Sequence, residues 1–314
     1  MSKNNILVTE NLTKRYSGFT ALDNLSLGIA KNTCVGLLGP NGAGKSTTIK
    51  IMTGLLRPTL GTALIEGYDI QSNLRNALLN VGTVVETPEF PSYLTPSEVL
   101  SYFGRLRGMS KENIISRTNK VLELVNLNDW KRKKIAKFSK GMKQRVAIAA
   151  SLLHDPNLLI LDEPTSGLDP RGMIEVREII KSLKKEGKTV FLSSHLLGET
   201  QEICDSIVLI DKGKLLMYDT VENIRKLSKN PKIKIELLTS PTEEQRTIIS
   251  KLNGVKSITN ESDLKLIINF EGGMEERSEF LKKLQKNDFK IVSFNAESFD
   301  LESLYLDLVS ESVR

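Results

Sequence analysis

The sequence has few cysteines and no long hydrophobic run. Among 314 residues only Cys34 and Cys204 are cysteines, and they lie far apart in the chain. Two such residues build neither a disulfide framework nor a zinc cluster, so we expect both to be small, buried apolar side chains. No segment approaches the roughly 18 consecutive apolar residues of a membrane-spanning helix. Residues 1–10 lack the apolar core and cleavage site of a secretory signal, which predicts a cytosolic chain that reaches a membrane only through a partner.

A strong excess of charge of one sign is also missing. The chain has 44 basic and 38 acidic residues, a net charge of +6, while 39% of its residues are hydrophobic and 26% are charged. This composition is typical of a globular protein and excludes a largely disordered or collagen-like chain. Nucleic-acid-binding proteins concentrate more basic charge on one face, so no nucleic-acid partner is expected. At about 150 residues per domain, the length predicts two domains.

The first two-thirds of the chain alternates between short apolar runs and helical patterns. Strands followed by helices predict an α/β fold with a parallel sheet. Between Pro88 and Leu153 the strand signals disappear, and periodic apolar residues predict a helical subdomain. The predicted strands are 6–12, 34–38, 81–85, 158–162, 189–193 and 207–210, and the clearest helices are 45–53, 141–153 and 171–185.

A polar break at residues 228–231 predicts the boundary between a first domain, residues 1–228, and a second, residues 229–314. The second domain reads β-α-β-β-α-β, which is the order of a small α+β, ferredoxin-like unit. Its predicted elements are 233–238, 242–252, 255–258, 264–270, 274–285 and 289–294, followed by a last helix over 299–309.

Residues 39–46 (GPNGAGKS) match the phosphate-binding pattern G-x-x-x-x-G-K-[ST]. An apolar strand precedes them and a helix follows, which is the context that the motif requires. Backbone N–H groups and the helix N-terminus would hold the phosphates of ATP, while Lys45 would reach the β- and γ-phosphates and Ser46 would ligate Mg²⁺. The predicted nucleotide-binding residues of this loop are Gly39, Pro40, Asn41, Gly42, Ala43, Gly44, Lys45, Ser46 and Thr47.

A second signal is the apolar strand at 158–161, which ends in Asp162 and Glu163. In open α/β sheets, ligands bind at the carboxyl ends of the strands. We expect Asp162 to hold Mg²⁺ and Glu163 to act as the general base on the attacking water.

Further motifs stand in a fixed order around this acidic strand. Residues 138–145 (FSKGMKQR) lie upstream of it, 166–169 (SGLD) follow it, and 193–195 (SSH) end the next strand. Together with Tyr16 in 14–16 (KRY), these motifs make the sequence resemble the ATP-binding subunits of ABC transporters. The resemblance covers Ile6 to about Asp219 and implies a P-loop NTPase core with a helical subdomain.

The resemblance also implies roles for individual residues. Tyr16 would stack on adenine, and His195 would contact the γ-phosphate and position water. Ser139 and Gly141, at the start of a helix, would present N–H groups to the nucleotide of an opposing subunit. Asp169 would link the two facing sites, so the resemblance implies a homodimer that holds two ATP molecules between its subunits.

Two departures from the family pattern indicate a subclass. Glu86 stands where the family usually has Gln, and Lys140 and Met142 replace common signature residues. Glu86 can still ligate Mg²⁺, and we hypothesise that Lys140 partly offsets its charge. These features and residues 301–305 (LESLY) resemble ATPases of drug- and bacitracin-resistance exporters. The resemblance implies separately encoded transmembrane permease subunits and a place on the cytoplasmic face of the cell membrane.

Two alternatives and one unassigned feature remain. A soluble ABC ATPase of ribosomes, DNA or iron–sulfur assembly is less favoured, because only one phosphate loop and no sustained heptads occur. A regulatory module without turnover is opposed by the presence of both Glu163 and His195.

The basic run 131–134 (KRKK) is either a solvated turn or a contact with the membrane partner or anionic lipid headgroups.

Overall fold

The computed structural model describes residues 4–227, 232–296 and 305. The chain divides into two compact units, one running through Val221 and the other beginning at Glu222. The sequence placed the boundary after residue 228, whereas the structural division falls after the first residue of helix α8 (Val221–Leu227). The predicted helix over 299–309 lies outside the described residues except for Tyr305.

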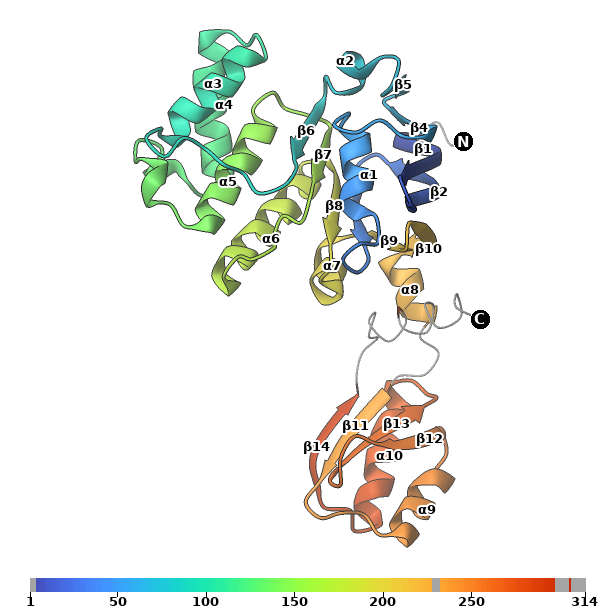
Figure 1. The fold of residues 1–314 in the computed structure, drawn as a ribbon. Coiled ribbons are helices and arrows are strands. Elements are labelled where there is room, and N and C mark those ends of the chain that lie inside the picture. Colours follow the sequence, from blue (N-terminus) through green and yellow to red (C-terminus); the bar gives the residue numbers. More distant parts are fainter. Residues whose placement is uncertain (1–3, 228–231, 297–304, 306–314) are drawn as a thin grey trace. The chain divides into compact units, whose positions relative to one another are not determined.

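The first unit is built around a six-stranded sheet with the order β10-β9-β3-β8-β7-β6 (Figure 1). The five strands from β9 to β6 run parallel, and β10 pairs antiparallel with β9. Every residue of β3, β7 and β8 is buried, as expected for strands covered on both faces. The bounds are β3 (Cys34–Leu38), β6 (Val81–Val84), β7 (Leu158–Leu161), β8 (Thr189–Ser194), β9 (Ser206–Asp211) and β10 (Lys214–Thr220).

A second, antiparallel sheet has the order β2-β1-β4-β5. Its strands are β1 (Asn5–Tyr16), β2 (Phe19–Ala30), β4 (Leu60–Ile65) and β5 (Tyr68–Asp69). The sequence predicted only part of β1. Register shifts interrupt the β1–β2 pairing, Asn24 has φ 56° and Gly61 has φ 74°, so the two-residue alternation that marks a strand is broken.

Helices complete the first unit and bury two hydrophobic cores. One core lies between the two sheets and includes Ile49 of α1 (Lys45–Met52), Leu7 and Leu37. The other joins the opposite face of the parallel sheet to the helices from α3 to α7. Three of these, α3, α4 and α5, lie together between β6 and β7 in the sequence, as predicted for the helical insertion (Figure 1). The helices are α2 (Leu74–Ala77), α3 (Pro96–Leu106), α4 (Lys111–Leu124), α5 (Lys140–Leu152), α6 (Pro170–Lys185) and α7 (Leu197–Ile203), with short 3₁₀ turns at Asn128–Trp130 and Ile135–Lys137.

The second unit has the β-α-β-β-α-β order that the sequence predicted. Its sheet order is β12-β13-β11-β14, and all neighbours are antiparallel, as in a ferredoxin-like unit. Alternate residues such as Ile233, Ile235 and Leu237 are buried in a core that also contains Phe270 and Phe280. The elements are β11 (Lys232–Leu237), α9 (Glu243–Lys251), β12 (Val255–Asn260), β13 (Lys265–Phe270), α10 (Met274–Lys286) and β14 (Ile291–Ala296).

Candidate functional site

The phosphate loop leaves β3 and enters α1 at Gly44, which has φ 106°. A Cβ atom at Gly44 would lie 2.6 Å from the Ala21 carbonyl oxygen, and one at Gly39 would collide with the Ile210 carbonyl. Only glycine suits position 44, because the backbone is left-handed there and a Cβ atom has no room. At position 39 only the lack of room for a Cβ atom requires glycine. The tight turn brings the backbone N–H groups at the start of α1 to the carboxyl edge of the parallel sheet.

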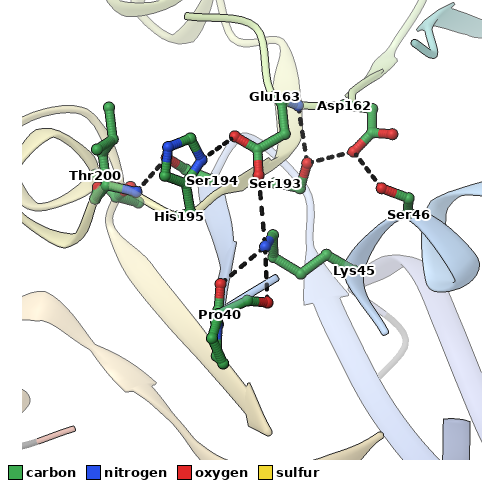
Figure 2. A network of polar contacts seen from close by, with 11 residues as sticks. Pro40, Lys45, Ser46, Asp162, Glu163, Ser193, Ser194, His195 and Thr200 are labelled. Carbon is green, nitrogen blue, oxygen red and sulfur yellow. Dashed lines mark hydrogen bonds and ion pairs between the residues drawn. The ribbon is translucent and has the colours of Figure 1, made fainter. Parts of the chain in front are cut away.

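Lys45 is buried, and its ammonium group lies at the centre of this loop. Its Nζ donates to the carbonyl oxygens of Gly39 at 2.8 Å and Pro40 at 3.2 Å (Figure 2). The same Nζ lies 3.5 Å from Glu163 Oε1. The phosphate loop and the acidic end of β7 therefore meet at one cation.

Two carboxylates follow β7, and β8 fixes both of them (Figure 2). The Ser193 hydroxyl donates to Asp162 Oδ1 at 2.6 Å and accepts from the Glu163 backbone N–H at 2.8 Å. Glu163 has φ 46°, a left-handed conformation that side-chain-bearing residues rarely adopt. Ser193 stabilises this turn, a role that sequence reasoning did not assign to it.

Glu163 and His195 form a direct pair, with His195 Nδ1 2.7 Å from Glu163 Oε2. A carboxylate only accepts hydrogen bonds, so the proton of this bond resides on Nδ1. Asp162, in contrast, faces the phosphate loop, where the Ser46 hydroxyl donates to its Oδ1 at 3.4 Å. The two neighbouring acids thus point to different partners, one to a histidine and a lysine and the other to two serines.

These groups line an open cleft of about 770 Å³. One end carries Tyr16, whose ring stacks on Phe19 with centroids 5.2 Å apart and planes inclined by 21°. Both rings are exposed, and Lys14 Nζ lies 5.1 Å from the Tyr16 ring centroid. Phe19 is a second flat surface that sequence reasoning missed, since it belongs to the unpredicted strand β2. The cleft residues are Tyr16, Phe19, Ala21, Asn41, Gly42, Gly44, Lys45, Ser46, Thr47, Glu163, Ser166 and His195.

Glu86 follows β6 and has φ 63°, but its surroundings differ from those of Glu163. Its carboxylate is 66% exposed and forms an ion pair of 2.6 Å with Lys50 on α1. This bond lowers the pKa of Glu86 and raises the pKa of Lys50. The cation that pairs with Glu86 is therefore Lys50, a partner that the hypothesis about Lys140 did not include.

The signature residues gather at a different place, outside the cleft lining. Ser139 begins α5 and accepts from the Met142 N–H at 3.2 Å, while Asp169 begins α6 and accepts from the Gly172 N–H at 3.2 Å. The two helix starts are adjacent, because a Cβ at Gly141 would lie 3.5 Å from Gly172 Cα. The structure therefore brings Ser139, Gly141 and Asp169 together, apart from the group around Lys45.

Buried Arg145 holds α5 in this position. Its guanidinium donates to the carbonyl oxygens of Val125 at 3.0 Å and Asn126 at 3.1 Å, and it lies 3.2 Å from Glu175 on α6. An ion pair whose guanidinium also donates to backbone carbonyls of a third segment ties three elements together.

The second histidine, His154, lies outside the cleft lining and is structural. Its Nε2 lies 3.2 Å from the Val81 carbonyl oxygen at the start of β6. Burial, together with the nearby Arg107 guanidinium, lowers the pKa of His154 to about 4. It is therefore neutral at pH 7.

Across the described ranges, no helix combines the length and the apolar character needed to cross a membrane. The same ranges hold no group of three or more His, Cys, Asp or Glu side chains placed to hold a metal ion by themselves.

Comparison with known proteins agrees with this geometry. A family model described as ABC transporter matches residues 22–166. The chain is 36% identical to the ABC transporter ATP-binding protein YhcH of Bacillus subtilis (strain 168), over 98% of this chain and 97% of that protein. It is 43% identical to the bacitracin transport ATP-binding protein BcrA of Bacillus licheniformis, over 70% and 72%. 

A solved structure of a dimeric ATP-binding cassette, in a post-hydrolysis state with ADP and phosphate, superposes with a TM-score of 0.62 at 26% identity. That match covers 68% of this chain and 98% of the cassette. The predicted P-loop NTPase fold of the ABC type is confirmed. The chain belongs to the ATP-binding proteins of ABC transporters and is the ATP-hydrolysing subunit of such a transporter.

Proposed function

We propose that this chain uses Glu163 as the general base for ATP hydrolysis and, as a homodimer, drives export through separately encoded transmembrane subunits. One observation carries the catalytic part of the proposal. Lys45, Glu163 and His195 form a continuous set of polar contacts beside the phosphate loop, within one cleft.

The cleft holds ATP by contacts along its length. Tyr16 and Phe19 offer aromatic faces to adenine. The N–H groups of the turn around Gly42 and Gly44 donate to the phosphate oxygens, and the N-terminus of α1 adds partial positive charge. Lys45 exchanges its two carbonyl partners for the β- and γ-phosphates, since an ammonium group binds phosphate more strongly than a neutral carbonyl.

The residues near Ser46 fit a magnesium ion. Mg²⁺ prefers hard oxygen ligands and is usually bound by one or two carboxylates together with substrate phosphates. Ser46 Oγ and Asp162 Oδ1, 3.4 Å apart, supply this kind of donor set. Ser46 and Asp162 would hold the ion, which when bound neutralises phosphate charge. Glu86 would join them only after leaving Lys50.

Glu163 then removes a proton from the attacking water. In the structure its two carboxylate oxygens face Lys45 and His195. Once Lys45 turns to the phosphates, Oε1 is free to accept that proton. His195 keeps Glu163 oriented through Nδ1, and its exposed ring would contact the γ-phosphate of bound ATP. Positioning and charge stabilisation supply most of the rate in such phosphoryl transfers.

The position of the signature residues supports the proposed homodimer. Ser139, Gly141 and Asp169 form a separate group outside the cleft, so a nucleotide in the cleft is not enclosed by them. A second copy would place this group over the nucleotide, with Asp169 between the two sites. The dimeric cassette that this chain resembles supports the proposal.

The proposed direction of transport is inferred from the names of similar proteins. Their names include bacitracin transport, lantibiotic transport and linearmycin resistance. We infer export, two permease subunits that carry the cargo specificity, and a place on the cytoplasmic face of the cell membrane. A soluble ABC ATPase with a non-transport partner is the alternative.

The test is co-expression with candidate permease subunits, followed by purification and an ATPase assay in lipid vesicles. We expect a complex with two copies of this chain per transporter and a rate that rises when a cargo peptide such as bacitracin is added. Recovery of the chain only with ribosomes or DNA would favour the alternative.

A further inference from the structure

The segment 128–140, which precedes and enters α5, is strongly basic. It contains six basic residues and a single acidic one. Five of the cations are exposed, and four of these, Arg132, Lys133, Lys134 and Lys137, precede α5. None of these four forms an ion pair within 4 Å of an acid in the part of the chain that the structure describes. The nucleotide cleft does not include this segment.

The shape of this segment is fixed by backbone hydrogen bonds. Ile135 N–H donates to the Leu94 carbonyl and Ala136 N–H to the Ser92 carbonyl, each at 2.9 Å. Residues 92–94 therefore lie beside the cations. The residue between these two acceptors, Tyr93, has 68% of its surface exposed.

A second aromatic residue borders the same cations. Trp130 packs edge-on against Phe138 with centroids 5.8 Å apart, and Lys133 Nζ lies 4.2 Å from its ring centroid. Its side chain remains 36% exposed. The six residues Tyr93, Trp130, Arg132, Lys133, Lys134 and Lys137 make up what we call the basic loop surface.

Two acids near this surface offset only part of its charge. Glu98 accepts from the Thr95 N–H at 2.8 Å and the Thr95 hydroxyl at 2.9 Å at the start of α3, and its charge also acts on Lys134. Asp129 is the one acid within the segment itself. The cations outnumber these two carboxylates, so the surface keeps a net positive charge that attracts anions.

We propose that the basic loop surface binds anionic phospholipid headgroups at the membrane. Clusters of Lys and Arg next to a bilayer are attracted by its negative surface potential. Trp and Tyr concentrate at membrane–water interfaces, because their rings are apolar and their edges are polar. An acidic protein segment would explain the cations but would not require an exposed Trp and an exposed Tyr beside them. This proposal rests on the membrane placement proposed above, and it adds a direct lipid contact to it.

The test uses the purified full chain and vesicles of phosphatidylcholine with or without phosphatidylglycerol. We expect strong co-sedimentation only with the anionic vesicles, weakening as salt is raised. The triple variant Arg132→Gln, Lys133→Gln, Lys134→Gln should bind them roughly 10- to 100-fold more weakly, at up to about 1 kcal/mol for each cation. A matched variant, Lys282→Gln, Lys286→Gln, Lys290→Gln, removes three exposed cations of the second unit and should bind as the native chain does.

Trp130 gives an independent readout, because it is the only tryptophan of the chain. Its fluorescence should shift to shorter wavelength on anionic vesicles and be quenched by brominated lipid. Equal binding by the two triple variants, or no quenching in vesicle-bound protein, would overturn the lipid assignment. Loss of permease binding by the loop variant in lipid-free detergent would also overturn it, in favour of a protein partner.

The ATPase rate of the isolated chain separates this proposal from the proposed function. Both triple variants should keep that rate, since none of the six substituted residues lines the nucleotide cleft. Intact hydrolysis with no lipid binding would reject the lipid contact alone.

Discussion

Two glutamates follow neighbouring parallel strands, and both have a positive φ angle. Glu163 ends β7 with φ 46°, and Glu86 follows β6 with φ 63°. The side chain of Glu163 is 24% exposed and touches Lys45 and His195, whereas that of Glu86 is 66% exposed and touches Lys50. Both glutamates thus lie at the carboxyl edge of the sheet. Only Glu163 contacts Lys45 and His195, which we propose to bind the γ-phosphate.

The difference teaches that neighbours, more than position, decide what an acid at a sheet edge can do. Glu163 is fixed at its backbone by Ser193 and at its carboxylate by His195. A group fixed in this way needs little reorganisation during reaction. An exposed ion pair such as Lys50–Glu86 is weakened by water and salt.

The largest effect is expected from Glu163→Gln. Glutamine keeps the size of the side chain but cannot take a proton, so we expect the rate of hydrolysis to fall by about 10²- to 10⁴-fold. ATP binding, measured with a fluorescent analogue, should remain within a few-fold, since the phosphate loop is unchanged. A variant that still turns over rapidly would remove Glu163 as the general base.

A smaller effect is expected from Ser193→Ala. The change removes the hydroxyl that accepts from the Glu163 N–H and donates to Asp162. The free energy of unfolding should therefore fall by about 1–3 kcal/mol. The rate should fall by roughly tenfold, because both acids lose their fixed positions. The matched control is Ser194→Ala, whose hydroxyl accepts from the Leu196 N–H. If Ser194→Ala reduced hydrolysis as much, the role given to Ser193 would be lost.

Glu86→Gln should change hydrolysis much less. We expect the Mg²⁺ concentration for half-maximal rate to change by about two- to threefold, because the carboxylate is exposed and shared with Lys50. The measurement is an ATPase assay over a magnesium titration. No change in either the rate or the magnesium dependence would leave Glu86 without a metal role.

The smallest effect on hydrolysis is expected from His154→Gln, which lies at the opposite end of β6 from Glu86. The pKa of His154 is about 4 in the folded chain and near 6.5 in the unfolded chain, so the unfolded chain binds the proton more readily. The contribution of neutral His154 to the free energy of unfolding is therefore present above pH 6.5 and is lost as the pH falls toward 4.

Between pH 7 and pH 5, the free energy of unfolding of the native chain should therefore fall by about 1 kcal/mol more than that of His154→Gln. This value allows for the partial exposure of His154. Denaturant unfolding at both pH values measures this. Equal losses in the two proteins would mean that His154 does not titrate in this way.

Much of the site was visible in the sequence because its residues stand in local motifs. The continuous apolar runs of β3 and β7 predicted the strands that carry the phosphate loop and the acids. The strand β2 was missed, since bulges and the left-handed Asn24 break its alternation. Its residue Phe19 was missed with it.

Contacts between distant segments could not be predicted from the motifs. Ser193 and Asp162 are 31 positions apart, and only the pairing of β7 with β8 brings them together. Likewise, the choice of Lys50 as the partner of Glu86 depends on where α1 lies beside the end of β6. The sequence supplies the charge of such residues, and the fold supplies their neighbours.

The two cysteines have a practical consequence. Cys34 and Cys204 are both buried, with their Sγ atoms 3.5 Å apart, and burial raises the pKa of Cys204. Thiol reagents attack exposed thiolates, so the native chain should give little background labelling. A single cysteine introduced at an exposed position near Ser139 or Tyr16 could then carry a spin label or fluorophore. The approach of the signature helix to the cleft of a second copy could be followed without first replacing either native cysteine.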